Sequence, residues 1–333
     1  MPDVLIGCYT PPAGQGDGIT AGAVSGAIAA ASGMGTVISP SFLAVHPHLP
    51  IVYAVSELEH GRLVTLRREG GGALTVVDDR PTQGGEPCHV AISPDSRWVA
   101  VANYKDGSLV AFALDEQGLP TGDGQLMRHD GSGPVAGRQA GPHCHQVSFD
   151  GELLTVTDLG ADRIHRYVLE GSTWVVAPAG DVVLRPGTGP RHQVVDGTLR
   201  FVVGELDGRV TSFRVSAGGE WSELGSAPTT SFSGTSYPSH IVLFKGHLYV
   251  GNRGADTIGV LRVDGEGRPE YVGETATGGA WPRHFAIVGD DVVVANERSH
   301  EVTVLALNRE SPLPVGASGR LAAGSPTCIV TVT

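Results

Sequence analysis

The sequence predicts an all-β fold, a seven-bladed β-propeller, from three observations. A short pattern that begins with a proline recurs along the chain, at Pro40, Pro87, Pro142, Pro190, Pro238, Pro282 and Pro326. Successive prolines lie 44 to 55 residues apart, the length of a four-stranded propeller blade. Between them lie short apolar runs with period-two alternation, separated by Gly, Asp and Asn turns, and no run has a convincing helical period.

The second repeat shows how one blade is built. We predict a first strand over 89–93, a second over 98–103 and a third over 108–114, with a turn between the first two at Pro94-Asp95-Ser96. The Ala-rich segment 21–31 is interrupted by glycines, so we predict a strand followed by a loop there.

The two ends of the chain complete the seventh blade. Residues 325–332 match a first strand, 3–9 a second strand and 17–24 a third. The C-terminal segment should therefore pair with the N-terminal one, which closes the ring and removes open sheet edges. We expect one domain over residues 1–333, because no interior linker interrupts the repeats.

Composition excludes several classes of function. The 333 residues carry a net charge of −12 and only two lysines, so the basic surface that nucleic-acid binding needs is missing. No stretch approaches the ~20 apolar residues that span a membrane. The four cysteines have no pair-like spacing, which indicates reduced thiols and a cytoplasmic protein.

Polar residues recur at two positions of the repeat. The first and second strands of a blade are antiparallel, so the start of one and the end of the other meet at the same mouth of the central channel. In register, the first position holds Phe42, His89, His145, His192, His240, His284 and Cys328. The second position holds Ser56, Asn103, Asp158, Glu205, Asn252, Asn296 and Cys8. Arg191 and Arg283 directly precede two of the histidines.

These residue types suit a small anionic substrate. Arginine binds carboxylate or phosphate in a planar fork and stabilises an oxyanion, and histidine or glutamate can move a proton. Glu205 stands out because a shorter side chain would suffice for a turn. Arg191 and Arg283 also suggest a substrate role, because burying an unpaired guanidinium costs free energy. A structural interpretation stays open for the histidines and for Asp158, because polar groups at strand ends also serve as turn and ladder hydrogen bonds.

We predict no metal and no cofactor. The histidines come from different blades and lack the close spacing of zinc motifs. The sequence also has no Gly-x-Ser-x-Gly elbow, no P-loop and no dinucleotide fingerprint after a strand.

At these residues the sequence resembles the seven-bladed propeller lactonases of the bacterial 6-phosphogluconolactonase type. The resemblance covers most of the chain and rests on six motifs in family order: Gly131-Ser-Gly with Arg138-Gln-Ala-Gly-Pro-His143-Cys-His145, Asp158-Leu-Gly-Ala-Asp162, Gly189-Pro-Arg191-His192, Gly204-Glu205-Leu, Asn252-Arg-Gly-Ala-Asp256 and Pro282-Arg283-His284.

The resemblance implies hydrolysis of 6-phosphogluconolactone to 6-phosphogluconate in the pentose phosphate pathway. It implies a metal-independent site that draws on His145, Arg191, Glu205 and Arg283, with Arg138 and His143 nearby. We add His192, His89, His284 and Asp158 as expected substrate contacts. Either Glu205 or His145 would activate water. The expected partner is an anionic small-molecule lactone, and the expected oligomeric state is a monomer.

Two other functions compete with lactone hydrolysis. The family is similar to fungal 3-carboxy-cis,cis-muconate lactonizing enzymes, so a cycloisomerase could use the same residues to bind a polycarboxylate. A non-catalytic propeller that binds a ligand or protein on its rim is the third alternative. Aromatic residues make up only 6% of the chain, which disfavours a broad aromatic docking surface.

Overall fold

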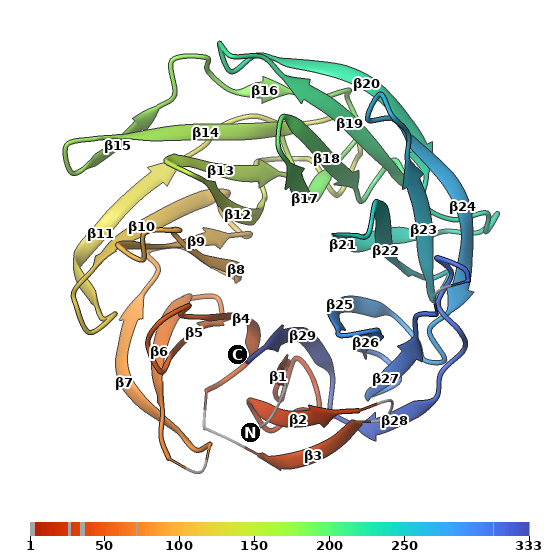
Figure 1. Cartoon of the computed structure of the whole chain (residues 1–333). Coiled ribbons are helices and arrows are strands. Elements are labelled where there is room, and N and C mark those ends of the chain that lie inside the picture. The colour runs from red at the N-terminus through yellow and green to blue at the C-terminus, as the bar shows by residue number, and fades with distance from the viewer. Residues whose placement is uncertain (1–3, 26–27, 34–36, 71, 309, 333) are drawn as a thin grey trace. The chain divides into compact units, whose positions relative to one another are not determined.

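The computed structural model describes residues 4–25, 28–33, 37–70, 72–308 and 310–332, and every regular element within them is a β-strand. The strands form seven sheets of four strands, one of which gains a short fifth strand (Figure 1). The prediction of an all-β, seven-bladed propeller is therefore confirmed. In the described ranges there is no helix with the length and apolarity needed to cross a membrane.

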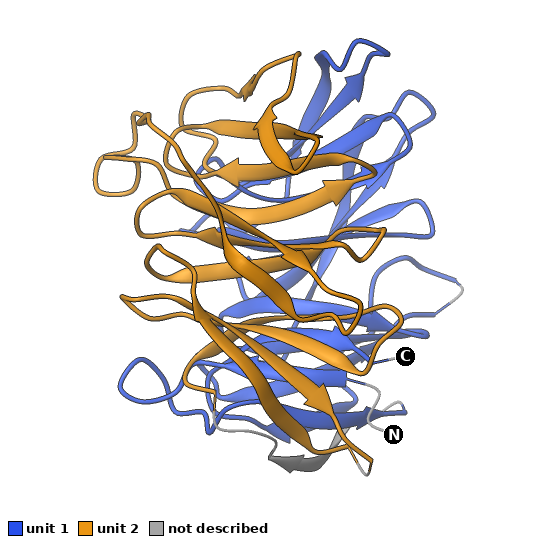
Figure 2. Ribbon diagram, turned by 90° about the vertical axis from the view of Figure 1, so that its left-hand side faces the viewer, with its two compact units in different colours: residues 1–33, 191–332 blue, residues 34–190, 333 orange. Residues whose placement is uncertain are grey.

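The chain divides into two compact units, residues 34–190 and residues 1–33 with 191–332 (Figure 2). The first of these, called the three-sheet unit, contains the strands β4 (Pro40–Val45), β5 (Ile51–Ser56), β6 (Arg62–Arg68), β7 (Leu74–Pro81), β8 (Pro87–Ile92), β9 (Trp98–Asn103), β10 (Ser108–Leu114), β11 (Pro120–Arg128), β12 (Cys144–Asp150), β13 (Leu153–Asp158), β14 (Arg163–Glu170), β15 (Thr173–Val176) and β16 (Val182–Val183). Its sheets are β4–β7, β8–β11 and β12–β15, and β16 pairs with β14.

The second, called the four-sheet unit, contains β1 (Val4–Cys8), β2 (Thr20–Val24), β3 (Ile28–Gly33), β17 (Pro190–Asp196), β18 (Leu199–Gly204), β19 (Arg209–Val215), β20 (Trp221–Pro228), β21 (Tyr237–Phe244), β22 (His247–Arg253), β23 (Thr257–Val263), β24 (Pro269–Ala276), β25 (Pro282–Val288), β26 (Asp291–Asn296), β27 (Glu301–Ala306), β28 (Gly319–Ala322) and β29 (Pro326–Thr331). Its sheets are β17–β20, β21–β24, β25–β28 and the terminal sheet β29-β1-β2-β3, which contains strands from both ends of the chain. The expectation of a single domain over residues 1–333 stays a prediction.

The terminal sheet joins the two ends of the chain as the sequence predicted. β1 pairs antiparallel with β29, with Leu5 opposite Val330 and Ile6 opposite Ile329. One detail was wrong: the stretch after Val24 was predicted as a loop, but its described part is the strand β3, in which Ala30 pairs with Gly22. Small residues are compatible with a strand when an adjacent strand supplies the ladder.

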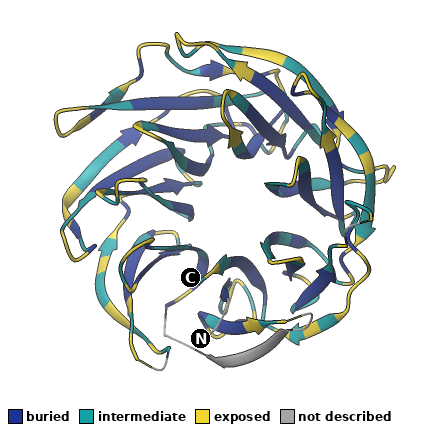
Figure 3. Ribbon diagram, in the orientation of Figure 1, coloured by how far each residue is buried: buried dark blue, intermediate teal, exposed yellow. Residues whose placement is uncertain are grey.

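Each unit buries apolar side chains between neighbouring sheets (Figure 3). In the three-sheet unit, β5, β9 and β10 contribute fully buried residues such as Tyr53, Val101 and Phe112 to one cluster. In the four-sheet unit, Phe201 and Val250 belong to a cluster between the sheets β17–β20 and β21–β24. The central strands are therefore near-continuous apolar runs, and polar side chains collect at strand ends.

The first strands begin with a recurring backbone device. The residue before the anchor proline has a positive φ at Ser39, Glu86, Gly189, Trp281 and Ser325, with values of 40° to 65°. Only Gly189 adopts this region without a steric penalty, which is about 1–2 kcal/mol for other residues. The proline that follows then enters the strand with its own φ fixed.

A β-bulge follows the proline. In β25, Pro282 pairs with Asn296 and His284 with Ala295, so Arg283 is the extra residue. The same shift leaves Ser41 as the extra residue in β4 and Cys88 in β8. A bulge takes one residue out of the ladder and re-aims its side chain.

This register corrects the alignment of His145. In the sheet β12–β15 the shift falls between Cys144 and Gln146, so His145 occupies the bulge position, equivalent to Arg283 and not to His284. The turn after the strand is not the cause, because β12 and β25 both end in two-residue turns, with Asp150 opposite Leu153 and Val288 opposite Asp291. Instead, Pro142 lies ahead of Cys144, the first paired residue of β12, whereas Pro282 is itself the first paired residue of β25, so positions counted from the proline do not correspond.

The pairing of β29 with β1 predicts that the C-terminal strand supports the whole sheet. Deleting residues 325–333 should lower the thermal unfolding midpoint by more than about 5 °C, because Cys328 and Ile329 are at most 1% exposed. A chain ended after Thr331 is the matched control and should keep the wild-type midpoint. An unchanged midpoint in the longer deletion would contradict the closure.

Candidate active site

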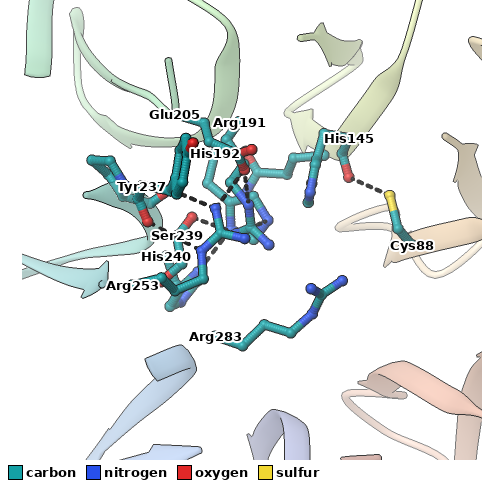
Figure 4. A network of polar contacts seen from close by, with 12 residues as sticks. Cys88, His145, Arg191, His192, Glu205, Tyr237, Ser239, His240, Arg253 and Arg283 are labelled. Carbon is teal, nitrogen blue, oxygen red and sulfur yellow. Dashed lines mark hydrogen bonds and ion pairs between the residues drawn. The ribbon is translucent and has the colours of Figure 1, made fainter. Parts of the chain in front are cut away.

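The centre of the candidate site is an ion-paired cluster of Glu205, Arg191 and Arg253 in the four-sheet unit (Figure 4). Arg191 lies in β17, Glu205 follows β18, and Arg253 ends β22. The Oε2 atom of Glu205 is 3.1 Å from Arg191 Nε and 2.5 Å from Arg253 Nη2. The three residues are only 2% to 6% exposed, so each buried charge depends on the others.

Arg191 also begins a chain of hydrogen bonds through two histidines. Its Nη1 donates to the carbonyl oxygen of Ser239 and to Nε2 of His192, the latter at 3.5 Å. Because arginine can only donate, neutral His192 carries its proton on Nδ1, and that N–H donates to Nδ1 of His240 at 2.8 Å. Burial and the charge of Arg191 lower the pKa of His240 to about 3, so His240 is neutral and accepts this bond.

Arg253 keeps part of its guanidinium unused by the protein. Its Nε donates to the carbonyl of Tyr237, and Nη2 donates to that of Pro238 as well as to Glu205. Nη1 donates to no group within the part of the chain that the structure describes. The half-buried indole of Trp281 lies 5.6 Å from the guanidinium carbon.

Arg283, also drawn in Figure 4, makes a separate pair. Its Nη1 donates to Glu297 at 3.4 Å, Nη2 donates to the Tyr9 hydroxyl, and its guanidinium carbon is 4.9 Å from the Tyr9 ring centroid. The neighbouring His284 accepts the backbone N–H of Ile329 on Nδ1 and stacks on His240 at 3.9 Å. His284 therefore has a structural role in joining β25 to β29.

In the three-sheet unit, two predicted site histidines share Tyr104. The His143 ring stacks on that of Tyr104 with centroids 4.6 Å apart, and its Nδ1 donates to the Tyr104 carbonyl at 2.9 Å. The His145 ring meets Tyr104 edge-on at 5.8 Å, and its backbone carbonyl accepts a weak bond from the Cys88 thiol at 3.2 Å. The bulge thus gives His145 and His143 one common aromatic support.

The remaining predicted residues of this unit have structural contacts. Asp158 accepts the backbone N–H groups of His143, Gly160 and Ala161 on Oδ1, which is the turn-forming interpretation that the sequence left open. His89 stacks on Phe42 at 4.0 Å. Arg138 is half-buried, and its backbone N–H donates to Val135 at 3.1 Å.

The structure thus brings Glu205, Arg191 and His192 into one network, and His143, His145 and Asp158 into another, each within its own unit. Sequence reasoning did not select Arg253, which only follows a second-position residue, Asn252. The available signal was its place directly after Asn252, beside the second position of the repeat.

The described residues contain no group of three or more His, Cys, Asp or Glu side chains arranged to hold a metal ion. The histidines instead contact arginine, aromatic rings and one another.

Comparison with known proteins places this geometry in context. A family model described as a lactonase, a seven-bladed β-propeller, matches residues 3–331. A 6-phosphogluconolactonase of Formosa agariphila is 30% identical over 288 residues, 81% of this chain and 81% of that protein. A 6-phosphogluconolactonase of Bacillus subtilis is 28% identical over 287 residues, 82% of this chain and 81% of that protein.

The solved structure of a periplasmic gluconolactonase from Pseudomonas aeruginosa has a TM-score of 0.92 and 27% identity, covering 99% of this chain and 98% of that one. These similarities do not test the cytoplasmic location or the monomeric state, and both stay predictions.

Proposed function

This chain belongs to the seven-bladed β-propeller lactonase family, and we propose that it hydrolyses 6-phosphogluconolactone to 6-phosphogluconate. The proposed activity is that of a carboxylic-ester hydrolase acting on a ring ester. Two relatives at 28% to 30% identity carry the name 6-phosphogluconolactonase, and this supports the choice of substrate.

One observation carries the proposal of an anionic substrate: Arg253 is 6% exposed, yet its Nη1 has no partner among the described residues. A buried guanidinium that protein groups satisfy only in part is a strong donor for a phosphate or carboxylate oxygen. Glu205 and two backbone carbonyls hold the rest of the guanidinium, so this donor is fixed in place before any ligand binds.

The proposed reaction assigns separate tasks to binding and to chemistry. Water attacks the lactone carbonyl carbon and gives its proton to a base. The carbonyl oxygen becomes an oxyanion that a guanidinium stabilises, and the carbon–oxygen bond of the ring then breaks. The released ring oxygen takes up a proton, so the product is an open-chain hydroxy acid whose carboxyl group ionises at neutral pH.

We assign the base to His145 and a positioning role to Glu205. The Oε2 atom of Glu205 already accepts a hydrogen bond from Arg253 and forms an ion pair with Arg191, so this carboxylate holds the guanidiniums that bind the anion. His145 sits at a bulge, against Tyr104, with the imidazole chemistry that suits proton transfer near neutral pH. Arg283 is assigned to the substrate as a second anion-binding guanidinium.

The direct test is proton release by the purified protein against a panel of substrates. We expect 6-phosphogluconolactone to be opened with a kcat/KM at least about tenfold above that for unphosphorylated gluconolactone, after subtraction of spontaneous hydrolysis, because a phosphate adds charge-assisted bonds. Preference for the unphosphorylated lactone would contradict the substrate. An absorbance change with 3-carboxymuconate alone would indicate a cycloisomerase, and no reaction with any compound would indicate a binding propeller.

Replacement of Arg253 tests the anion-binding donor. Arg253→Lys keeps the positive charge but removes the planar fork, so KM should rise about tenfold or more while kcat changes less. Arg262→Lys is the control, since Arg262 forms only an exposed pair with Glu270. Wild-type kinetics in Arg253→Lys would remove this residue from the site.

Two variants separate the base from the positioning residue. His145→Asn should lower kcat by ~10²–10⁴-fold with little change in KM, whereas Glu205→Gln should mainly raise KM because Arg191 and Arg253 lose their shared negative charge. Single-turnover rates and ligand affinity are measured for both, after circular dichroism has established folding. If Glu205→Gln shows the loss of kcat instead, the two assignments are reversed.

A further inference from the structure

A second buried network, which lactone hydrolysis does not explain, lies in the three-sheet unit. His165 on β14 contacts an aspartate with each ring nitrogen: Nδ1 is 2.8 Å from Asp181 Oδ2, and Nε2 is 3.2 Å from Asp158 Oδ2. The His165 ring also stacks on His129, with centroids 3.8 Å apart and an interplanar angle of 18°. The His165 and Asp158 side chains are 5% and 0% exposed.

The partners determine the charge of both histidines. Carboxylates only accept hydrogen bonds, so His165 can satisfy two of them only as the doubly protonated imidazolium. Burial opposes that charge, but the bonds to Asp158 and Asp181 outweigh it and raise the pKa of His165 above its ordinary value.

His129 is instead neutral, because its pKa is lowered. Its Nδ1 faces the carbonyl oxygen of Gly107 at 2.6 Å, and its Nε2 meets the Tyr167 hydroxyl at 2.6 Å, which donates to it. The Cys144 thiol lies 3.3 Å from the same Nδ1. Burial and the charge on His165 lower the pKa of His129 to about 4, so the stacked pair holds one charge.

The charged histidine has one aspartate on the solvent side and one inside. The Asp181 side chain is 25% exposed and lies 3.9 Å from Arg163. Arg166 bonds to the carbonyls of Ala179 and Gly180 next to Asp181 and leaves its carboxylate to His165. The Asp158 side chain is not exposed to solvent, so its Oδ2 atom depends on His165 for a hydrogen bond.

Through Asp158 the network reaches the segment that carries two proposed site histidines. Asp158 Oδ1 accepts the N–H of His143 at 2.7 Å, and the N–H of Leu159 donates back to the His143 carbonyl at 2.9 Å. The two segments are in close contact, because a Cβ added at Gly160 would lie 1.9 Å from the carbonyl oxygen of Gly141. Any shift of Asp158 would therefore move the backbone on which His143 and His145 sit.

We propose that His165 is a positioning residue whose imidazolium, held between Asp158 and Asp181, fixes the 141–145 segment and makes its placement depend on pH. An effect of this placement on turnover rests on the proposed function of His145. The dependence of the placement on His165 does not rest on it. Neutral His165 has one N–H for two carboxylates, so one of them loses its donor.

The sign of the pH dependence follows from the raised pKa of His165. The stabilisation is complete below the unfolded-state value near 6.5 and is lost as pH rises through the higher folded-state value. We therefore expect the 141–145 backbone to loosen on the alkaline side.

The test combines a titration with amide exchange, both on the full chain without substrate. Nitrogen NMR of the histidine side chains should show His165 titrating above its ordinary value. Hydrogen–deuterium exchange of peptides covering 141–146 should show protection, corrected for the intrinsic rate, falling about tenfold across that titration, the size expected when a buried carboxylate loses one hydrogen-bond donor.

Asp181→Asn is the decisive variant, because an asparagine amide can donate to neutral His165 while His165 still donates to Asp158. The pKa of His165 should fall, and the alkaline loss of protection should disappear. Asp79→Asn removes an exposed carboxylate paired with Arg62 in the same unit and should behave as the wild type. His165→Phe keeps a ring against His129 but no donor, and should lower the protection of His143 at every pH.

The proposal is overturned if His165 is neutral at pH 6, or if it titrates while the protection of His143 stays constant. It is also overturned if Asp181→Asn keeps the wild-type pH profile. Where the protein hydrolyses a lactone, kcat should decrease on the alkaline side along the same titration, and Asp181→Asn should remove that decrease. A protein that opens no lactone but shows the expected exchange would contradict the proposed function and retain the positioning role.

Discussion

The β-bulge at the start of the first strands is the constraint on which the polar chemistry of this fold depends. A propeller blade needs its first strand to be paired and buried, so an ordinary ladder leaves no place for a charged side chain. The bulge adds one residue outside the alternation, and a proline ahead of it removes one backbone donor. Arg283 and His145 occupy that extra position. The residue before the proline, such as Trp281, accepts a left-handed conformation as the cost of this geometry.

The same irregularity supplies the acceptors that keep arginine buried in the four-sheet unit. In β21 the register shifts between Pro238 and Ile241, so the carbonyls in this stretch turn away from regular pairing. Arg253 bonds to the carbonyl of Pro238 and Arg191 to that of Ser239. A buried guanidinium needs several acceptors in addition to a counter-charge. The bulge therefore provides the carbonyl acceptors, and Glu205 provides the charge.

The sequence predicted the fold more completely than the site, for reasons that particular residues make plain. Proline spacing and turn residues are local signals, so the strands 98–103 and 108–114 have the bounds that the sequence predicts. Glu205 was recognisable because it breaks a repeat. Arg253 was not, because its importance comes from a contact with Glu205, 48 residues away in sequence and in another sheet. His165 gave no signal at all, since it has the appearance of an ordinary polar residue in a strand.

At the position that ends the second strand of a blade, glutamate has one methylene group more than asparagine or aspartate, and this extra length changes the role of the side chain. Asn252 donates its amide N–H groups to the carbonyl of Thr229, which follows β20, and to the hydroxyl of Thr257, which begins β23, and Asp158 accepts three backbone N–H groups on Oδ1. Shorter side chains in this position form their hydrogen bonds close to the strand end. The longer side chain of Glu205 carries its carboxylate past the turn to guanidiniums on β17 and β22. A carboxylate that the turn does not consume is the one that can organise arginines around a ligand, and this is why the repeat yields an anion-binding cluster at Glu205 but a backbone clamp at Asp158.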